Sequence, residues 1–305
     1  MKPFDFHGVK GYTLQNDSLE VRLIEIGAAI EGIRFAGREV ALYSEAPGFY
    51  EDNPGCVGVI VGRYANRIAK AQFTLGTATY HLTVNDRENN LHGGSDRPYH
   101  KRIWNSEAVG ENSVRFWLHS PDGDNGFPGN LTAEVVYTLQ DHTLRLDFYG
   151  RCDQDTVYGP ASHCYFNLSG GGSIMGTKMQ IAAERYVAVD HELIPTGEIC
   201  PVKGTKFDFR TMREISEDYD NCFALDSADA VHLEKDGIAL SVCTDYPGVQ
   251  IYTGIDLPEP FGKSGGIAVE AQFYPDSPNH PNFPFTPLKA WDHFHRYVAY
   301  TFEKV

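Results

Sequence analysis

The 305-residue sequence predicts an all-β protein, a large antiparallel β-sandwich with few short helices. Three observations favour this class. Apolar and polar residues alternate over many short segments, as in half-buried strands. The 30 glycines and 17 prolines supply turns, while 17 tyrosines and 18 phenylalanines favour strands. No run of about 12 residues or more carries an apolar stripe at helical spacing.

The individual strands follow from the alternation. Segments 19–26, 113–119 and 143–149 each alternate apolar with polar residues and are bounded by Gly, Asp, Asn or Pro clusters. Each therefore has one apolar face, which must meet a second sheet. Apolar runs around His163, Asp220, Gln250 and Glu270 are also predicted to be strands. Residues 213–215 are expected to open a short turn.

The chain shows no sign of division into domains. It contains no internal repeat, low-complexity segment or flexible linker, and three consecutive glycines at 170–172 are too few to link domains. These glycines are not a nucleotide-binding fingerprint either, because no strand–helix unit surrounds them. We therefore expect a single domain over residues 1–305.

Charge and composition narrow the class of partner. The net charge of −15 comes from acidic residues spread along the chain, which argues against nucleic acid and anionic membranes as partners. The N-terminus lacks the apolar stretch of a secretion signal, and no segment is long and apolar enough to cross a membrane. Six widely spaced cysteines without a CxxC pair are expected to be reduced thiols. Together these features predict a cytoplasmic protein.

Two residues stand out because their chemistry differs from that of their surroundings. His163 lies inside an apolar and aromatic run, where it is either a hydrogen-bonded core residue or a catalytic group. Glu270 lies inside an apolar strand near the C-terminus. A buried carboxylate needs partners or a raised pKa, and either condition suits a general base, whereas a solvent-facing glutamate has no such role.

Four further polar residues are candidates for binding. His92 precedes two glycines at a strand-to-loop junction, where the backbone can approach a ligand, although it could equally face water. Arg67, in a turn, can donate several hydrogen bonds to ligand oxygens or form a structural ion pair. Asp220 and Gln250 each occupy the edge of an apolar strand.

The order of these motifs is more specific than any one of them. Along the chain come Asn66-Arg67-Ile68, Leu91-His92-Gly93-Gly94, His163-Cys-Tyr-Phe-Asn167-Leu, Gly248-Val-Gln250-Ile-Tyr252-Thr-Gly254 and Val269-Glu270-Ala-Gln-Phe-Tyr-Pro-Asp276. In this order the sequence resembles the aldose 1-epimerase (galactose mutarotase) family, from about Glu20 to Phe302.

The resemblance implies a fold, an activity and roles for the candidate residues. It implies a large antiparallel β-sandwich that binds a sugar in a cleft and interconverts the α and β anomers of aldohexoses such as glucose and galactose. Glu270 matches the general base that takes the proton of the anomeric O1 hydroxyl, and His163 matches the acid that protonates ring oxygen O5. His92, Arg67, Asp220 and Gln250 match groups that bind the sugar. No metal, cofactor or covalent intermediate is expected.

Further residues bear on the substrate. Asn66 is a possible site residue, and Tyr64 or Phe273 could cover an apolar face of the sugar. Ser162 and Asn221 depart from the family pattern of asparagine and histidine, so they bear on substrate preference if they line the cleft. The expected partner is a small sugar, and the expected assembly is a monomer or a homodimer.

Other functions remain open at this stage. A non-catalytic sugar-binding protein could use the same cleft, and an epimerase could prefer a pentose or a disaccharide. A glycoside hydrolase would need two carboxylates, such as Glu270 and Asp220, but His163 would then have no role. A metal enzyme built from His92, His163 and Asp220 lacks a short His-x-His or His-x₃-His pair.

Overall fold

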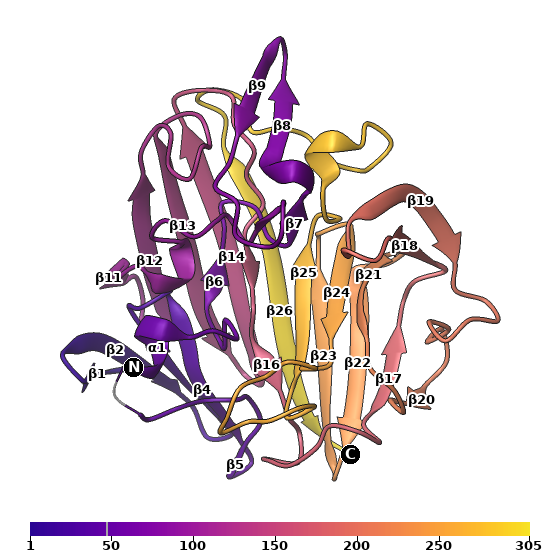
Figure 1. The fold of residues 1–305 in the computed structure, drawn as a ribbon. Coiled ribbons are helices and arrows are strands. Elements are labelled where there is room, and N and C mark those ends of the chain that lie inside the picture. The colour runs from indigo at the N-terminus through magenta and orange to yellow at the C-terminus, as the bar shows by residue number, and fades with distance from the viewer. Residues whose placement is uncertain (47) are drawn as a thin grey trace.

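The computed structural model describes residues 1–46 and 48–305, and almost all of its regular structure is antiparallel sheet (Figure 1). The predicted all-β class is confirmed. The nine-stranded sheet consists, in spatial order, of β11 (Asn105–Ala108), β12 (Ser113–Ser120), β13 (Leu131–Gln140), β14 (Thr143–Cys152), β26 (Phe294–Lys304), β23 (Ile238–Thr244), β22 (Asp229–Lys235), β17 (Lys178–Ile181) and β20 (Arg213–Glu214).

Two smaller sheets and three short ribbons complete the described fold. The six-stranded sheet has the order β16 (Tyr165–Phe166), β25 (Ile267–Gln272), β24 (Gly248–Tyr252), β21 (Asp220–Ala224), β18 (Arg185–Val189) and β19 (Pro195–Pro201). The five-stranded sheet runs through β1 (Lys2–Phe6), β2 (Val9–Gln15), β3 (Leu19–Ile24), β4 (Ala29–Phe35) and β5 (Arg38–Glu39). The ribbons pair β6 (Ile60–Val61) with β15 (Ala161–Ser162), β7 (Arg67–Ile68) with β10 (Asn90–Leu91), and β8 (Gln72–Leu75) with β9 (Ala78–His81).

Helical turns are short, as the composition predicts. They are α1 (Phe49–Asp52) and the 3₁₀ turns η1 (Ala69–Ala71), η2 (Tyr99–Lys101) and η3 (Ser277–Asn279). Among the described residues, no helix has the length and apolar character needed to span a membrane. Each of the six cysteines, all within the described part of the chain, is a free thiol.

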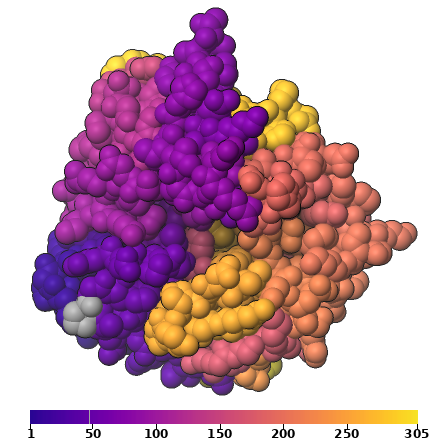
Figure 2. Space-filling model, in the orientation of Figure 1, coloured from indigo at the N-terminus to yellow at the C-terminus, as the bar shows by residue number. Residues whose placement is uncertain are grey.

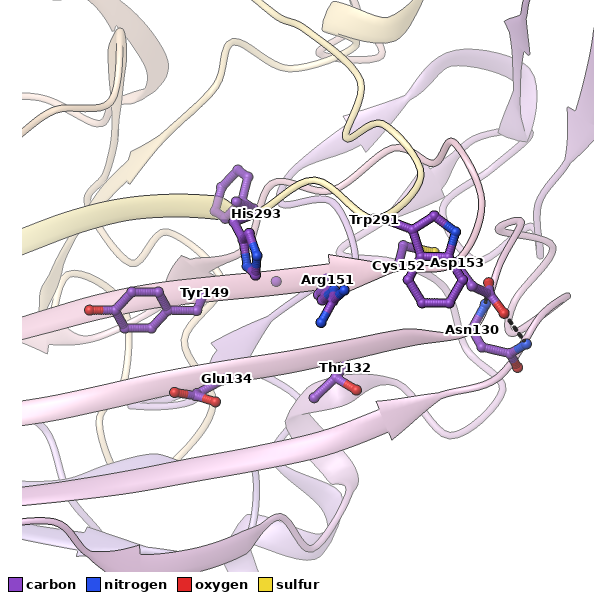
Figure 3. Close-up of a pocket in the computed structure, with 11 residues that line it drawn as sticks. Asn130, Thr132, Glu134, Tyr149, Arg151, Cys152, Asp153, Trp291 and His293 are labelled. Atoms are coloured by element: carbon purple, nitrogen blue, oxygen red, sulfur yellow. Dashed lines mark hydrogen bonds between the residues drawn. The ribbon is translucent and has the colours of Figure 1, made fainter.

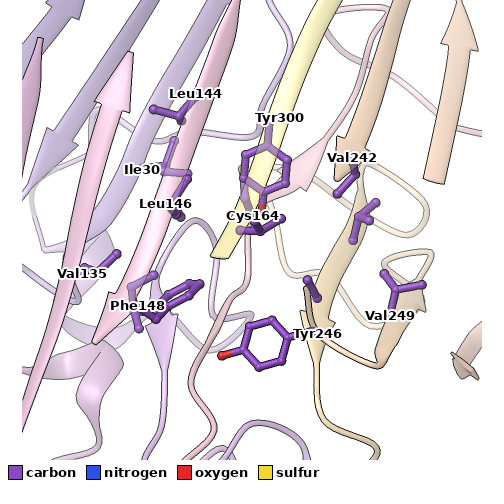
Figure 4. Close-up of a cluster of buried hydrophobic side chains, with 14 of the residues drawn as sticks. Ile30, Val135, Leu144, Leu146, Phe148, Cys164, Val242, Tyr246, Val249 and Tyr300 are labelled. Atoms are coloured by element: carbon purple, nitrogen blue, oxygen red, sulfur yellow. The ribbon is translucent and has the colours of Figure 1, made fainter. Parts of the chain in front are cut away.

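One hydrophobic cluster joins the three sheets. Along β13 the side chains alternate between buried and half-buried, because one face of the strand packs inward and the other faces outward. The inward residues Val135, Leu146 and Phe148 share a cluster with Ile30 of the five-stranded sheet and Val249 of the six-stranded sheet (Figure 4). Burial of this apolar surface is the main force that holds the sheets face to face.

Two local expectations are wrong. Residues 213–215 do not open a turn, because Arg213–Glu214 forms β20 and pairs with the edge strand β17. His163 does not lie inside a strand, but in the gap between β15 and β16. Here the chain changes partner from β6, which pairs with β15, to β25, which pairs with β16, and the local residue pattern does not show such a change.

A buried arginine, Arg63, connects the segment that leads to Arg67 with the loop over residues 120–129. The Arg63 side chain is 1% exposed, and its guanidinium donates to Ser120 Oγ at 2.8 Å. It also donates to the backbone carbonyls of Ser120 at 2.8 Å, Pro121 at 2.9 Å, Pro128 at 2.7 Å and Gly129 at 2.9 Å. These carbonyls would lose their partners without the guanidinium, so Arg63 has a structural role.

We therefore expect Arg63→Met to lower the free energy of unfolding by roughly 3–5 kcal/mol, because it leaves several buried carbonyls without donors. Urea denaturation measures this change. Arg145→Met is a suitable control, since Arg145 is half-exposed and pairs with Asp147 on the surface, and its loss should cost under about 1 kcal/mol. Equal, small losses in both variants would contradict the structural role of Arg63.

Candidate active site

A cleft of about 410 Å³ brings together most of the residues singled out in the sequence. Its surface is hollowed between the segment that includes residues 54–92 and the loop that follows β24 (Figure 2). The lining residues are Pro54, Gly55, Cys56, Asn66, Arg67, Asp86, Arg87, Leu91, His92, His163, Tyr165, Leu193, Asp220, Tyr252, Asp256, Leu257 and Glu270. Residues more than 200 positions apart in the chain thus meet at one place.

The β7–β10 ribbon positions Arg67 and His92 together. Leu91 pairs with Arg67 in this ribbon, and the backbone N–H of His92 donates to the Asn66 carbonyl at 3.1 Å. The Asn66 N–H in turn donates to His92 Nδ1 at 3.2 Å. Gly93 is needed next, because a Cβ there would lie 2.0 Å from the Gly62 carbonyl oxygen. The backbone of Asn66 therefore fixes both the main chain and the ring of His92.

Backbone hydrogen bonds also fix His163 although it lies between strands. Its N–H donates to the Val59 carbonyl at 2.9 Å, and its carbonyl accepts from the Gly58 N–H at 3.1 Å. The side chain is only 6% exposed. Its ring lies 5.1 Å from the ring of Tyr165 and 5.2 Å from that of His92, centroid to centroid. The imidazole therefore has a defined position at the cleft wall.

Three neighbouring strands of the six-stranded sheet present the remaining polar groups. Gln250 on β24 is the direct cross-strand partner of Glu270 on β25. On its other side, Gln250 Nε2 donates to Asp220 Oδ1 at 2.6 Å. Gln250 is 4% exposed and is not among the lining residues, so it lies beside the two carboxyl groups at the edge of the cleft.

The shortest contact between the two catalytic candidates is 3.6 Å, from His163 Nε2 to Glu270 Oε2. Burial raises the pKa of Glu270 well above its ordinary value, and the nearby charge of Asp220 raises it further. Burial also lowers the pKa of His163 to about 4 and holds the pKa of His92 well below its ordinary value. Near neutral pH the histidines are therefore neutral, and Glu270 loses its proton at a higher pH than an ordinary glutamate.

Several buried polar atoms in this region have no protein partner. Three such atoms have no hydrogen-bond partner among the described residues: Glu270 Oε2, His163 Nδ1 and Gln250 Oε1. Unpaired buried polar atoms are costly, and they concentrate where a polar ligand completes the hydrogen bonding. Their position favours a ligand rich in hydroxyl groups.

Arg67 forms the ion pair considered from the sequence and also lines the cleft. Its Nε donates to Asp86 Oδ2 at 2.7 Å, which is a partly buried ion pair, and both side chains line the cleft. The guanidinium has further N–H donors beyond the one used by Asp86. An arginine oriented by a carboxylate loses less side-chain freedom when it binds a ligand oxygen.

The structure does not bring Tyr64 or Phe273 to the cleft. Tyr64 is 1% exposed and donates its hydroxyl to the Tyr274 carbonyl at 2.8 Å, while Phe273 packs edge-on against Phe285 in the core. Their predicted place on a face of the sugar is wrong, because Phe285 packs edge-on against both rings. Ser162 and Asn221, which depart from the family pattern, do not line the cleft either.

Two tyrosines that the sequence interpretation missed do line the cleft. Tyr165 follows His163 by two positions, and Tyr252 follows Gln250 by two. Their rings lie 6.1 Å apart, and the Tyr165 hydroxyl donates to the Gly55 carbonyl at 3.1 Å. Alternation along a strand places residues two apart on one face, so the spacing from Gln250 was the available signal for Tyr252.

A metal centre is a further arrangement to consider at this cluster. In the described part of the chain, ligand atoms of His92, His163 and Glu270 lie within 4.8 Å of one another, and Asp220 is not among them. However, the Asn66 N–H donates to His92 Nδ1, so the proton of neutral His92 lies on Nε2. Neither nitrogen then offers a free lone pair, and the exposed edge of the ring suits a hydroxyl oxygen instead.

The fold and the cleft define a β-sandwich enzyme with a polar site that contains a buried carboxyl–imidazole pair. A family model described as "Aldose 1-epimerase" matches residues 10–300. The chain is 36% identical to a mouse protein named galactose mutarotase, covering 96% of this chain and 94% of that protein. It is 34% identical to the aldose 1-epimerase of Escherichia coli, covering 89% and 88% of the two chains.

Solved structures agree with this match. An aldose epimerase homologue from C. elegans superposes with a TM-score of 0.93 at 27% identity, covering 97% of this chain and 99% of its own. A galactose 1-epimerase from Lactobacillus acidophilus gives 0.89 at 28% identity, covering 97% and 95%. The chain belongs to the aldose 1-epimerase family. It is accordingly an isomerase that acts on carbohydrates.

Proposed function

We propose that this mutarotase interconverts the α and β anomers of aldohexoses such as glucose and galactose, with Glu270 as the general base and His163 as the general acid. The observation that carries the proposal is the 3.6 Å approach of His163 Nε2 to Glu270 Oε2 at the wall of a polar cleft. O1 and O5 of a cyclic sugar are bonded to the same carbon, so a closely spaced base and acid can address both oxygens at once.

The reaction opens and recloses the sugar ring. Glu270 takes the proton of O1, the C1–O1 bond becomes a carbonyl, the C1–O5 bond breaks, and O5 takes a proton from His163. The open-chain aldehyde then turns about its C1–C2 bond. O5 attacks the other face of C1, and both residues reverse their roles, so that the enzyme regains its starting protons.

A single proton shared by the pair suffices for this cycle. Burial favours this proton on Glu270, since it raises the pKa of Glu270 and lowers that of His163. Catalysis uses the state in which His163 holds the proton and Glu270 is ionised. Sugar hydroxyls that donate to the Glu270 carboxylate stabilise this state, as Arg67 does electrostatically.

The other cleft residues fit recognition of the sugar. Arg67 and the Nε2–H of His92 donate to sugar oxygens, whereas Asp220, supported by Gln250, accepts from sugar hydroxyls. Tyr165 and Tyr252 supply aromatic surface for the apolar face of the ring. Each of these roles is part of the proposal.

Polarimetry on freshly dissolved α-D-glucose and α-D-galactose tests the proposed function. The expected result is enzyme-dependent acceleration of the approach to anomeric equilibrium with at least one of them. Acceleration with only a pentose or maltose would show that the substrate is that sugar rather than an aldohexose. Sugar binding without acceleration would show that the protein is a non-catalytic sugar-binding protein. Release of reducing sugar from a glycoside would favour a hydrolase instead.

The pH dependence of kcat/KM should be bell-shaped. Below a pH of about 4 both His163 and Glu270 are protonated, so no base remains. Above the raised pKa of Glu270 both are deprotonated, so no acid remains. Polarimetric rates over about pH 3.5–9, with the enzyme-free rate subtracted, measure this profile. A rate that rises or falls steadily across the range would contradict a shared proton.

Asp220→Asn offers a matched variant for the alkaline limb. The charge of Asp220 raises the pKa of Glu270, so its removal should move that limb to lower pH. Asparagine preserves the size of the side chain and can still accept a hydrogen bond from Gln250. An unchanged alkaline limb would show that this limb reports the titration of a group other than Glu270.

The cytoplasmic location, the single domain and the monomeric or homodimeric state stay predictions.

A further inference from the structure

A second and larger pocket, of about 610 Å³, lies on the outer face of the nine-stranded sheet (Figure 3). It shares no lining residue with the cleft that contains Glu270. Asn130, Thr132, Glu134, Tyr149, Arg151 and Trp291 line most of it. Its volume is in the range of small-molecule sites, and the proposed mechanism makes no use of it.

The floor of this pocket is a regular array of side chains on β13 and β14. Thr132 is the cross-strand partner of Arg151, and Glu134 is the partner of Tyr149. Because residues two apart on a strand face the same side, these four side chains all point outward. The array consists of one aromatic ring, Tyr149, and three hydrogen-bonding side chains, of which Glu134 is acidic and Arg151 is basic.

Aromatic rings stand at both ends of the array. Tyr149 is 39% exposed and stacks on His295 of β26, with 4.8 Å between ring centroids and 23° between planes. Trp291 is 61% exposed, and the Arg151 guanidinium lies 5.4 Å from its ring centroid. The two exposed rings, flanked by hydrogen-bonding groups, offer apolar surface and polar contacts at one place.

The position of Trp291 is fixed by its backbone. Its φ is +68°, a left-handed conformation that bulky residues rarely adopt, and its N–H donates to the Cys152 carbonyl at 2.7 Å. Beside it, Asn130 Nδ2 donates to Asp153 Oδ2 at 2.8 Å, which orders that edge of the pocket (Figure 3). The ring is thus presented to solvent by a strained, hydrogen-bonded turn.

We propose that this pocket is a second carbohydrate-binding site, which binds a neutral oligosaccharide across the rings of Tyr149 and Trp291. Pyranose rings offer apolar faces and hydroxyl-bearing edges. The aromatic rings match the faces, while Thr132, Glu134 and Arg151 match the edges.

The charges of the pocket favour a neutral ligand. Glu134 pairs with Arg115 at 2.6 Å, which leaves Asp153 and Arg151 as opposite charges in the lining, so neither sign dominates. The net charge of −15 also disfavours polyanions. The hollow shape favours a small molecule over a flat protein partner. The site would bind sugar independently of the epimerase reaction.

Calorimetric titration with the methyl glycosides of maltotriose, cellotriose and β-1,4-galactotriose tests this proposal, because the methyl group prevents ring opening. At least one should bind the wild-type protein with a Kd of about 1 mM or tighter. Trp291→Ala and Tyr149→Ala should each weaken binding about tenfold or more. Phe6→Ala is the control, since Phe6 is a partly exposed ring on β1 of the five-stranded sheet that lines neither pocket, and its loss should leave the affinity unchanged.

Mutarotation of free glucose or galactose provides the second readout, and all three variants should keep the wild-type kcat/KM within about twofold. Absence of binding by all three glycosides at about 10 mM would overturn the proposal, as would wild-type affinity in Trp291→Ala. A homodimer that Trp291→Ala dissociates in sedimentation velocity, without sugar binding to the wild type, would identify the pocket as a subunit interface and also overturn it.

Discussion

Replacing Glu270 with glutamine is expected to lower kcat for anomer exchange by about 10³- to 10⁴-fold, because an amide cannot take the O1 proton. Glutamine keeps the shape of the side chain and can still hydrogen-bond a sugar, so KM should change much less than kcat. Polarimetry with saturating α-D-glucose or α-D-galactose measures the loss. Full activity in this variant would remove Glu270 from the proposed mechanism.

Glu31→Gln is a matched control for this experiment. Glu31 is a strand glutamate that is 2% exposed, as Glu270 is, but it pairs with Arg22 in the five-stranded sheet. Its replacement should lower stability and leave kcat within a few-fold of the wild type. Similar loss of activity in both variants would point to unfolding rather than to chemistry.

Glu270→Gln should raise the free energy of unfolding, whereas Glu31→Gln should lower it. The folded pKa of Glu270 is raised, so the stabilisation linked to its protonation is full below the unfolded pKa of about 4.5 and is lost as the pH rises through the folded pKa. The glutamine variant lacks this loss. Its free energy of unfolding should therefore exceed that of the wild type by an amount that increases from about pH 5 to pH 9.

His163→Ala is expected to reduce kcat by about 10²- to 10⁴-fold, because no group would then protonate O5 as the ring opens. His163→Asn should show a comparable loss while filling more of the space that alanine leaves empty. Stopped polarimetric assays on the same two sugars measure both. Turnover equal to that of the wild type would return His163 to a purely structural role.

His100→Asn controls for the loss of a buried histidine. His100 is 8% exposed and its pKa is also lowered to about 4 by burial, but it does not line the cleft. Activity should stay within a few-fold. For both histidines the folded pKa is depressed, so their stabilisation is present above about pH 6.5 and is lost as the pH falls toward about 4.

Much of the site could be predicted from the sequence because its motifs are short and ordered. The segments around Arg67, His92 and Glu270 lie in turns or strands whose local pattern is clear, and the structure brings them to one cleft. Tyr165 and Tyr252 were missed because an aromatic residue in a strand has the same local signal whether it faces a core or a cleft. That distinction depends on which distant segment covers the strand.

The sequence by itself determined the all-β class, the alternating strands such as β12 and β14, and the set of titratable residues that carry the chemistry. Only the tertiary structure decided that His163 lies in a break between two strands, that Tyr64 and Phe273 are buried, and that His163 Nε2 is 3.6 Å from Glu270 Oε2. The physical reason is the distance along the chain over which each property is determined. Alternation is a local property, whereas burial and the pKa shifts it causes depend on neighbours that are far apart in the chain.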